Sequence, residues 1–202
     1  MPLIPPTMQG MIIAKAASQM IAGSKLPNLV NAICMGTCQY ILSVSTVQST
    51  NIALGPGAGT QMGRIMGLVP TAMSSMMLMK ATASGLTGRD LNKLYSSVAF
   101  GVVQSMNMVI VQGSIIGAGP GSGQGKILGL VPTALSGIIM GMAAAQTIAG
   151  SKLQAIISAA AFGICTHIMS AGIVQLTDIG AAAGPPAGPI TIPVAPGIGR
   201  LM

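Results

Sequence analysis

The chain has 202 residues, of which 51% are hydrophobic and only 5% are charged, and its formal net charge is +7. Average soluble domains carry about 25% charged residues, so this composition excludes an isolated globular protein with an ordinary polar surface. It predicts that lipid or other protein subunits cover part of the chain. The cationic balance suits anionic partners, although the nine Lys and Arg residues form no basic run.

The chain opens with MPLIPPTMQG, which is interrupted by prolines and has no charged segment before an apolar stretch. A cleavable secretory signal peptide is therefore not expected at this end. The three cysteines do not form the framework of a secreted disulfide-rich protein. Together these features favour assembly in a reducing cytosol.

Three related stretches divide the chain. A turn-like block occurs at residues 21–26, 86–91 and 148–153, and GRIMGLVPTAMSS from Gly63 returns as GKILGLVPTALSG from Gly125. In each copy a Val-Gln pair, a Gly/Pro-rich run and a closing cation follow in the same order. We therefore predict three tandem repeats that form one compact unit. Their ranges are 1–66, 67–128 and 129–202, the last with a Pro/Gly-rich C-terminal extension.

Each repeat is predicted to contain two helices, a strand and a glycine loop. In the second copy, good helix formers after a proline predict a helix over 71–84. Apolar residues spaced by three or four predict a second helix over 89–105. The β-branched residues of 108–112 predict a strand, and the run GAGPGSGQG predicts a loop.

The expected fold class is thus mainly α with short β-strands, in three tandem helix-helix-strand-Gly-loop repeats. An open solenoid needs polar terminal repeats, and the sequence offers none. We therefore expect the repeats to close into a ring with pseudo-threefold symmetry.

A glycine recurs in the middle of the second helix of each repeat, at Gly36, Gly101 and Gly163. Glycine in a helix costs roughly 1 kcal/mol relative to alanine. We therefore expect a close helix crossing at each of these helix-packing glycines.

The repeats close on Arg64, Lys126 and Arg200, each followed by two apolar residues. In a threefold arrangement these cations occupy equivalent positions. They are candidate contacts for an anionic rim, a phosphate backbone or the carbonyl groups of a neighbouring subunit. Solvated surface cations are the alternative.

Catalytic and ligand-binding motifs are not apparent. The stretch GPGSGQGKI departs from the Walker pattern at Pro120 and Ile127, and its glycines do not match a dinucleotide fingerprint. The seventeen methionines suit adaptable core packing better than soft-metal binding. Few groups remain for acid–base chemistry or metal ligation: Cys34, Cys38, Cys165, His167, Asp90 and Asp178. We expect a protein that is not an enzyme and has no cofactor and no metal.

A membrane pore or lysis-type (holin-like) protein is the main alternative to a soluble assembly subunit. Residues 127–145 are uncharged and long enough to cross a bilayer. However, the equivalent segments contain Lys15 and Lys80, and no belt of Trp and Tyr is present. A basic module that binds anions or nucleic acid is a third possibility.

The Ala/Gly/Met-rich helices, the Val-Gln-x-Ser/Thr strands with Thr50, Ser114 and Thr177, and the GPGxG loops resemble small Gly/Ala-rich virion proteins of tailed bacteriophages. The similarity extends over the whole chain and is strongest to tail and baseplate components. It implies a noncatalytic building block in a hetero-oligomeric assembly with other structural subunits, with self-association as a further option. It also implies assembly in the host cytoplasm and a final location in the virion; the membrane is the alternative location.

Overall fold

The computed structural model describes residues 3–53, 57–117, 122–178 and 196–201. Along these residues the order helix, helix, strand, strand occurs three times. The described residues therefore confirm a mainly helical fold with short strands. The elements are α1 (Pro5–Ser18), α2 (Leu26–Val44), β1 (Thr46–Ala53), β2 (Gly57–Met66), α3 (Pro70–Ala83), α4 (Leu91–Met108), β3 (Ile110–Gly117), β4 (Ser122–Leu128), α5 (Pro132–Ala145), α6 (Leu153–Ala171), β5 (Ile173–Asp178) and β6 (Pro196–Leu201).

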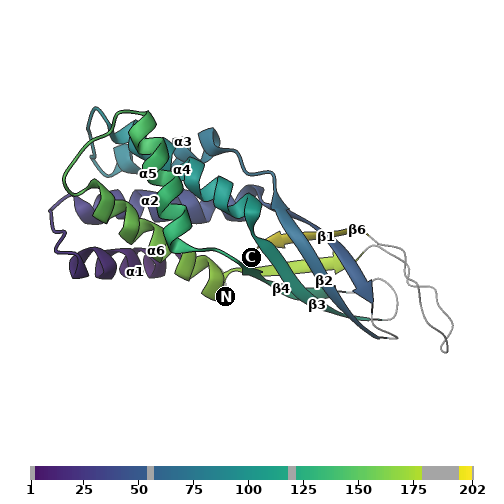
Figure 1. Ribbon diagram of the computed structural model, residues 1–202. Coiled ribbons are helices and arrows are strands. Elements are labelled where there is room, and N and C mark those ends of the chain that lie inside the picture. Colours follow the sequence, from purple (N-terminus) through teal and green to yellow (C-terminus); the bar gives the residue numbers. More distant parts are fainter. Residues whose placement is uncertain (1–2, 54–56, 118–121, 179–195, 202) are drawn as a thin grey trace.

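The helices occupy one end of an elongated molecule and the strands occupy the other (Figure 1). Each helix packs against the helices before and after it in the chain, and α1 packs against α6, so the helices form a closed ring. The longer helices α2, α4 and α6 lead directly into β1, β3 and β5. A single hydrophobic core runs through the helical end and into the barrel.

Proline and left-handed residues set the ends of the shorter helices. Pro5, Pro70 and Pro132 are the first residues of α1, α3 and α5, where the missing N–H is not needed. Past their C-termini the chain adopts positive φ angles of 56°, 69° and 58°. In each case the next amide bonds back to the last helical turn, which ends the helix. The residues with positive φ are Met20, Gly85 and Thr147.

The strands pair antiparallel in chain order, and β1 also pairs with β6, which closes a barrel. Because side chains alternate between the two faces of a strand, every second residue points into the barrel. One interior layer consists of aliphatic side chains with at most 1% exposure, so the barrel is filled at this level. Its described members are Val47, Ile65, Val111, Ile127 and Val174.

The next interior layer has little room for side chains. Leu176 is buried there, and a Cβ added to Gly113 would lie 2.6 Å from its Cδ1 atom. A Cβ on Gly125 would lie 3.0 Å from the same atom. The backbone of the paired strand is also close, since a Cβ on Gly113 would lie 2.8 Å from the carbonyl oxygen of Gln124 and one on Gly125 would lie 3.2 Å from that of Gln112, so glycine fits these positions where a larger residue does not.

The expected glycine loop is wrong in part, because the residues before each closing cation form a second strand. In the second copy, β4 covers Ser122–Leu128 and pairs with both β3 and β5. The predicted strand is also placed too early, since Met108 is the last residue of α4 and β3 starts at Ile110. The parts of the glycine runs at 54–56 and 118–121, and the C-terminal extension at 179–195, lie outside the described residues.

Candidate functional site

The closing cations lie on alternate strands of the barrel. Arg64 on β2 and Lys126 on β4 are exposed on its outer surface. Arg200 belongs to β6, and its side chain lies outside the described part of the structure. Each of the three stands opposite a glutamine of the repeated Val-Gln pair: Gln48 faces Arg64, Gln112 faces Lys126 and Gln175 faces Arg200.

The barrel does not bring the described cations together on one ligand. Arg64 and Lys126 point outward from strands that are separated by β3. A partner that surrounds the barrel can contact both. Their geometry suits a partner surface rather than a closed anion pocket.

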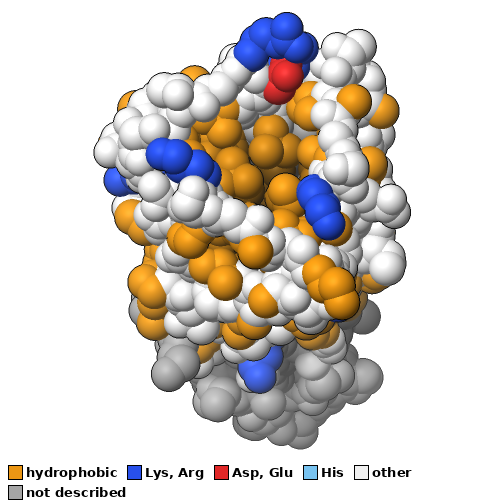
Figure 2. Space-filling model, turned by 90° about the vertical axis from the view of Figure 1, so that its left-hand side faces the viewer, with side chains coloured by type: hydrophobic (Ala, Val, Ile, Leu, Met, Phe, Trp, Pro, Cys, Tyr) orange, Lys and Arg blue, Asp and Glu red, His pale blue; other side chains and the backbone are white. Residues whose placement is uncertain are grey.

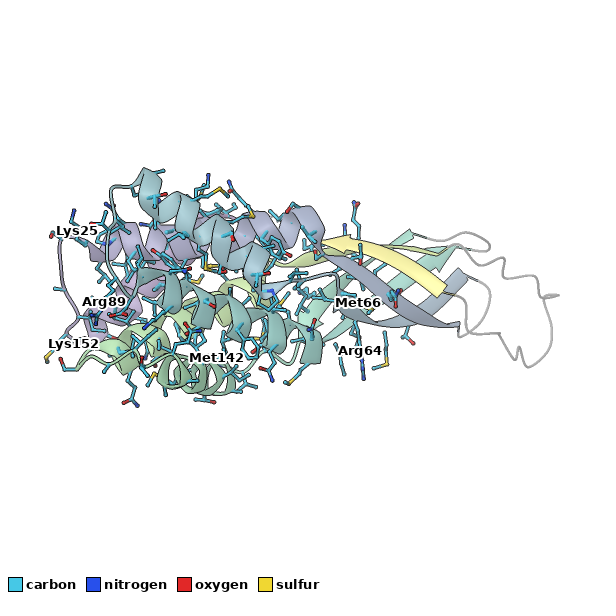
Figure 3. The ribbon with its side chains drawn as sticks, turned by 90° about the horizontal axis from the view of Figure 1, so that it is seen from above. Lys25, Arg64, Met66, Arg89, Met142 and Lys152 are labelled. Atoms are coloured by element: carbon cyan, nitrogen blue, oxygen red, sulfur yellow. The ribbon has the colours of Figure 1, made fainter. Side chains whose placement is uncertain are left out.

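Large apolar side chains are exposed close to the junction between helices and barrel. Nine of them, each at least 39% exposed, lie on the strands or at the helix ends next to the barrel. We call this set the waist: Ile4, Val44, Met62, Met66, Val69, Met108, Ile110, Leu128 and Val131. Figure 3 shows Met66 and Arg64 on the barrel, so apolar and cationic side chains are neighbours there.

The turns between the helices of each pair lie at the opposite end of the molecule. Figure 3 places Lys25, Arg89 and Lys152 together at this end, far from Arg64. Viewed along the long axis, this end is hollowed, with hydrophobic side chains inside and cationic side chains around the edge (Figure 2). Sequence reasoning identified the turns but did not reveal that they surround a hollow.

The three helix-packing glycines each face the first helix of the following helix pair. A Cβ on Gly36 would lie 2.9 Å from the backbone nitrogen of Met77 in α3, and a Cβ on Gly163 would lie 3.1 Å from that of Ile12 in α1. At Gly101 the nearest atoms belong to the side chains of α5, chiefly Ile139. Neighbouring helices thus approach closely at these positions.

Two partly buried hydrogen bonds also join consecutive helix pairs, and sequence reasoning missed both. The backbone N–H of Ile4 donates to Nε2 of His167 over 3.0 Å, and that of Val69 donates to Oη of Tyr40 over 2.9 Å. Burial lowers the pKa of His167. The sequence does contain a signal for these two residues: His167 and Tyr40 follow the turn glycines Gly150 and Gly23 at the same spacing.

The cysteines are buried and free. Burial raises the pKa of Cys34, raises that of Cys38 to about 12 and raises that of Cys165 to about 11. Burial therefore favours the protonated form of these thiols. Over the residues described, no group of three or more His, Cys, Asp or Glu side chains is placed to hold a metal ion.

One helix among the described residues, α6, has the length and hydropathy to cross a membrane. Half of its apolar window is buried inside the protein, between α1 and α5. Core helices of soluble proteins share these properties, so α6 does not decide between a membrane and an aqueous setting.

Comparison with known proteins gives no relative: no protein-family model matches the chain, and no match was found among curated proteins or solved structures.

Proposed function

We propose that this protein is a noncatalytic structural subunit of a large particle, of the tail or baseplate kind found in tailed-phage virions. In this proposal its three helix-helix-strand-strand segments are tandem repeats related by pseudo-threefold symmetry. The waist then docks against partner subunits arranged around a threefold axis. Self-association is a weaker option, since two copies would bring their cationic barrels together.

The waist is the observation that carries the proposal. Monomeric proteins rarely expose large contiguous apolar patches, and such patches mark interaction sites. Here the exposed apolar side chains form a band around the junction, beside Arg64 and Lys126. Interfaces of permanent complexes combine apolar contacts with a polar rim, which matches this arrangement.

A filled barrel interior also favours a docking role over a pore. Val47, Ile65, Val111, Ile127 and Val174 occupy the same interior layer and are almost completely buried. A pore through the barrel requires a water-filled lumen, and this layer leaves the described part of the barrel packed instead. A membrane pore formed by the helices and a nucleic-acid-binding role remain as distinct outcomes of the experiment.

The experiment replaces either waist residues or the closing cations, and it measures incorporation into the native particle; we call both kinds waist variants. A tagged Met66→Ser/Leu128→Ser variant and an Arg64→Gln/Lys126→Gln/Arg200→Gln variant are produced alongside the wild type in cells that assemble the particle. Met79→Ser is the matched control, because Met79 is 61% exposed on α3 but lies outside the waist. We expect both waist variants to be lost from the purified particle and Met79→Ser to be retained.

Native mass measurement of the wild-type complex tests the symmetry. We expect one copy of this chain for three copies, or a multiple of three, of a partner. Normal incorporation of both waist variants contradicts the proposal. Extraction of the protein only with detergent supports the membrane alternative, and a DNA affinity that falls steeply with salt supports the nucleic-acid alternative.

A further inference from the structure

The hollow at the helical end has an apolar lining that the waist proposal does not use. α2, α4 and α6 all begin at this end, and each carries two aliphatic side chains three residues apart in its first turns. Residues at this spacing lie on the same face of a helix. All six side chains are only partly buried and pack on the core: Leu26, Leu29, Leu91, Leu94, Leu153 and Ile156.

The hollow is closed below these two layers. One turn further along the same helices, Ile33, Val98 and Ala160 are each only 1% exposed. Because a helix rises about 1.5 Å per residue, the two lining layers are about 4.5 Å apart. The hollow is thus a shallow apolar dish rather than a tunnel.

The rim of the dish is cationic in all three segments. Lys25 and Lys152 are exposed at equivalent turns. In the middle segment Asp90 occupies that position but forms ion pairs with Arg89 and Lys93 at 3.8 Å and 3.4 Å. The turn of each segment therefore carries one net positive charge, +1, +2 − 1 and +1, which sum to +3, and Lys15 and Lys80 in the last turns of α1 and α3 add two cations at the same end.

This charge excludes a second copy of the chain as the occupant. Two helical ends placed face to face would oppose rims of equal charge, and like charges across an interface are strongly unfavourable. Placing the barrel of a second copy in the dish would bring the Arg64 and Lys126 side chains of that copy against the cationic rim. The occupant must therefore be acidic around an apolar centre.

We infer that the helical end docks the acidic, apolar-tipped end of a homotrimeric protein. One net positive charge from the turn of each segment matches one carboxylate from each chain of a trimer, whereas a single lipid headgroup offers one. This inference rests on the pseudo-threefold arrangement of the proposed function. It makes the protein a connector, with one docking surface at the waist and another at the helical end.

A synthetic trimer provides a defined probe. A parallel coiled-coil peptide with isoleucine at its a and d positions favours trimers, and it is given a leucine tip flanked by one glutamate per chain. Matched probes carry lysine in place of glutamate, or lack the coiled coil and stay monomeric. By fluorescence anisotropy we expect the glutamate trimer to bind at least about tenfold more tightly than either matched probe.

Charge reversal locates the binding. The variant Lys25→Glu/Arg89→Glu/Lys152→Glu is expected to lower the affinity for the glutamate trimer at least about tenfold. The variant Arg64→Glu/Lys126→Glu is expected to leave this affinity unchanged, because its cations lie on the barrel. Circular dichroism melts confirm that both variants are folded.

Three outcomes overturn the inference: equal binding of the glutamate and lysine trimers, binding that the rim variant does not weaken, or no binding of the glutamate trimer. Phosphatidylglycerol vesicles that bind through the rim while the trimer does not would assign the dish to lipid instead. If the waist variants are lost from the particle but the trimer test fails, the proposed function is kept and only the docking role of the helical end is rejected.

Discussion

A single buried imidazole joins α6 to the start of α1. Nε2 of His167 accepts a hydrogen bond from the backbone N–H of Ile4, so this nitrogen must be unprotonated and the neutral ring carries its proton on Nδ1. Nδ1 is buried, with no partner among the described residues. The folded protein therefore favours the neutral ring, since a second proton would remove the bond to Ile4 and place a charge in the core.

We predict a loss of stability on acidification that depends on His167. Burial lowers the pKa of His167 below its usual 6.5, so below pH 6.5 the unfolded chain takes up a proton that the folded state does not bind. Stability is then complete above about 6.5 and falls as the pH decreases from there. Thermal melts between pH 8 and 5 should show this decline for the wild type.

The matched variant is His167→Gln, whose amide oxygen can accept the same bond but does not titrate. His167 is the only histidine in the chain, so the variant should be less stable than the wild type at pH 8 and should have a flatter profile. Parallel profiles for the two proteins would show that His167 does not cause the decline.

At the level of elements, the helix ring depends on close contacts at glycine. Gly36 faces the backbone of Met77, and Met77 is completely buried. The residues Met8, Ile12 and Ala16 of α1 recur in α3 as Met73, Met77 and Ala81, and all of them are buried. Each first helix thus presents one buried stripe, and the central residue of this stripe lies over the glycine of the preceding segment.

We predict that Gly36→Ala lowers the free energy of unfolding by about 1–3 kcal/mol, because the added methyl group must displace the α3 backbone. Gly137→Ala on α5 is the matched control, since a Cβ there meets nothing within 4 Å. That change should raise stability by about 0.5–1 kcal/mol through the better helix propensity of alanine. Urea denaturation measures both, and equal effects at the two sites would argue against packing as the reason for Gly36.

The helices could be predicted from the sequence within a few residues, because local signals determine their ends. Pro70 starts α3 and Gly85 follows its end, against a predicted range of 71–84. The apolar spacing of α4 predicted its existence, although the helix continues to Met108. These signals act over one or two turns, which a single sequence displays.

The second strands were missed because their glycines suggested a loop. In β4, Gly123, Gly125 and Ile127 alternate with Gln124 and Lys126, which is the period of a strand. At Gly125 an added Cβ would lie within 3.2 Å of Leu176 in β5 and of Val111 and Gln112 in β3. The reason for the glycines is thus a contact between strands that are distant in the sequence. The waist and the hollow were missed for the same reason, since each gathers residues from all three segments.

At the scale of the whole molecule, the first and last segments close both the ring and the barrel. α1 packs against α6, and β1 pairs with β6 from Thr46 to Thr50. The ends of the described chain lie close together: Ile4 bonds to His167, and Leu201 stands opposite Val174, just beyond the end of α6. Figure 1 shows the N and C labels side by side at the junction of helices and barrel.

If the three segments are equivalent repeats of a closed ring, the position of the chain break is not important for the fold. We predict that a circular permutant that starts at Gly67, with residue 202 joined to residue 1 by a short Gly/Ser linker, folds with a melting temperature within about 10 °C of the wild type. The new break falls between β2 and α3, where Gly67 is exposed. A truncation to residues 1–128 is the contrasting variant, because it leaves β1 and β4 each with only one neighbouring strand and uncovers the faces of α1 and α4 that pack on α6 and α5. We expect it to aggregate, since unpaired strand edges and an exposed core promote association. Calorimetry and size-exclusion chromatography distinguish the two, and a monomeric, cooperatively folded 1–128 fragment would show that closure by the third segment is not what stabilises the ring.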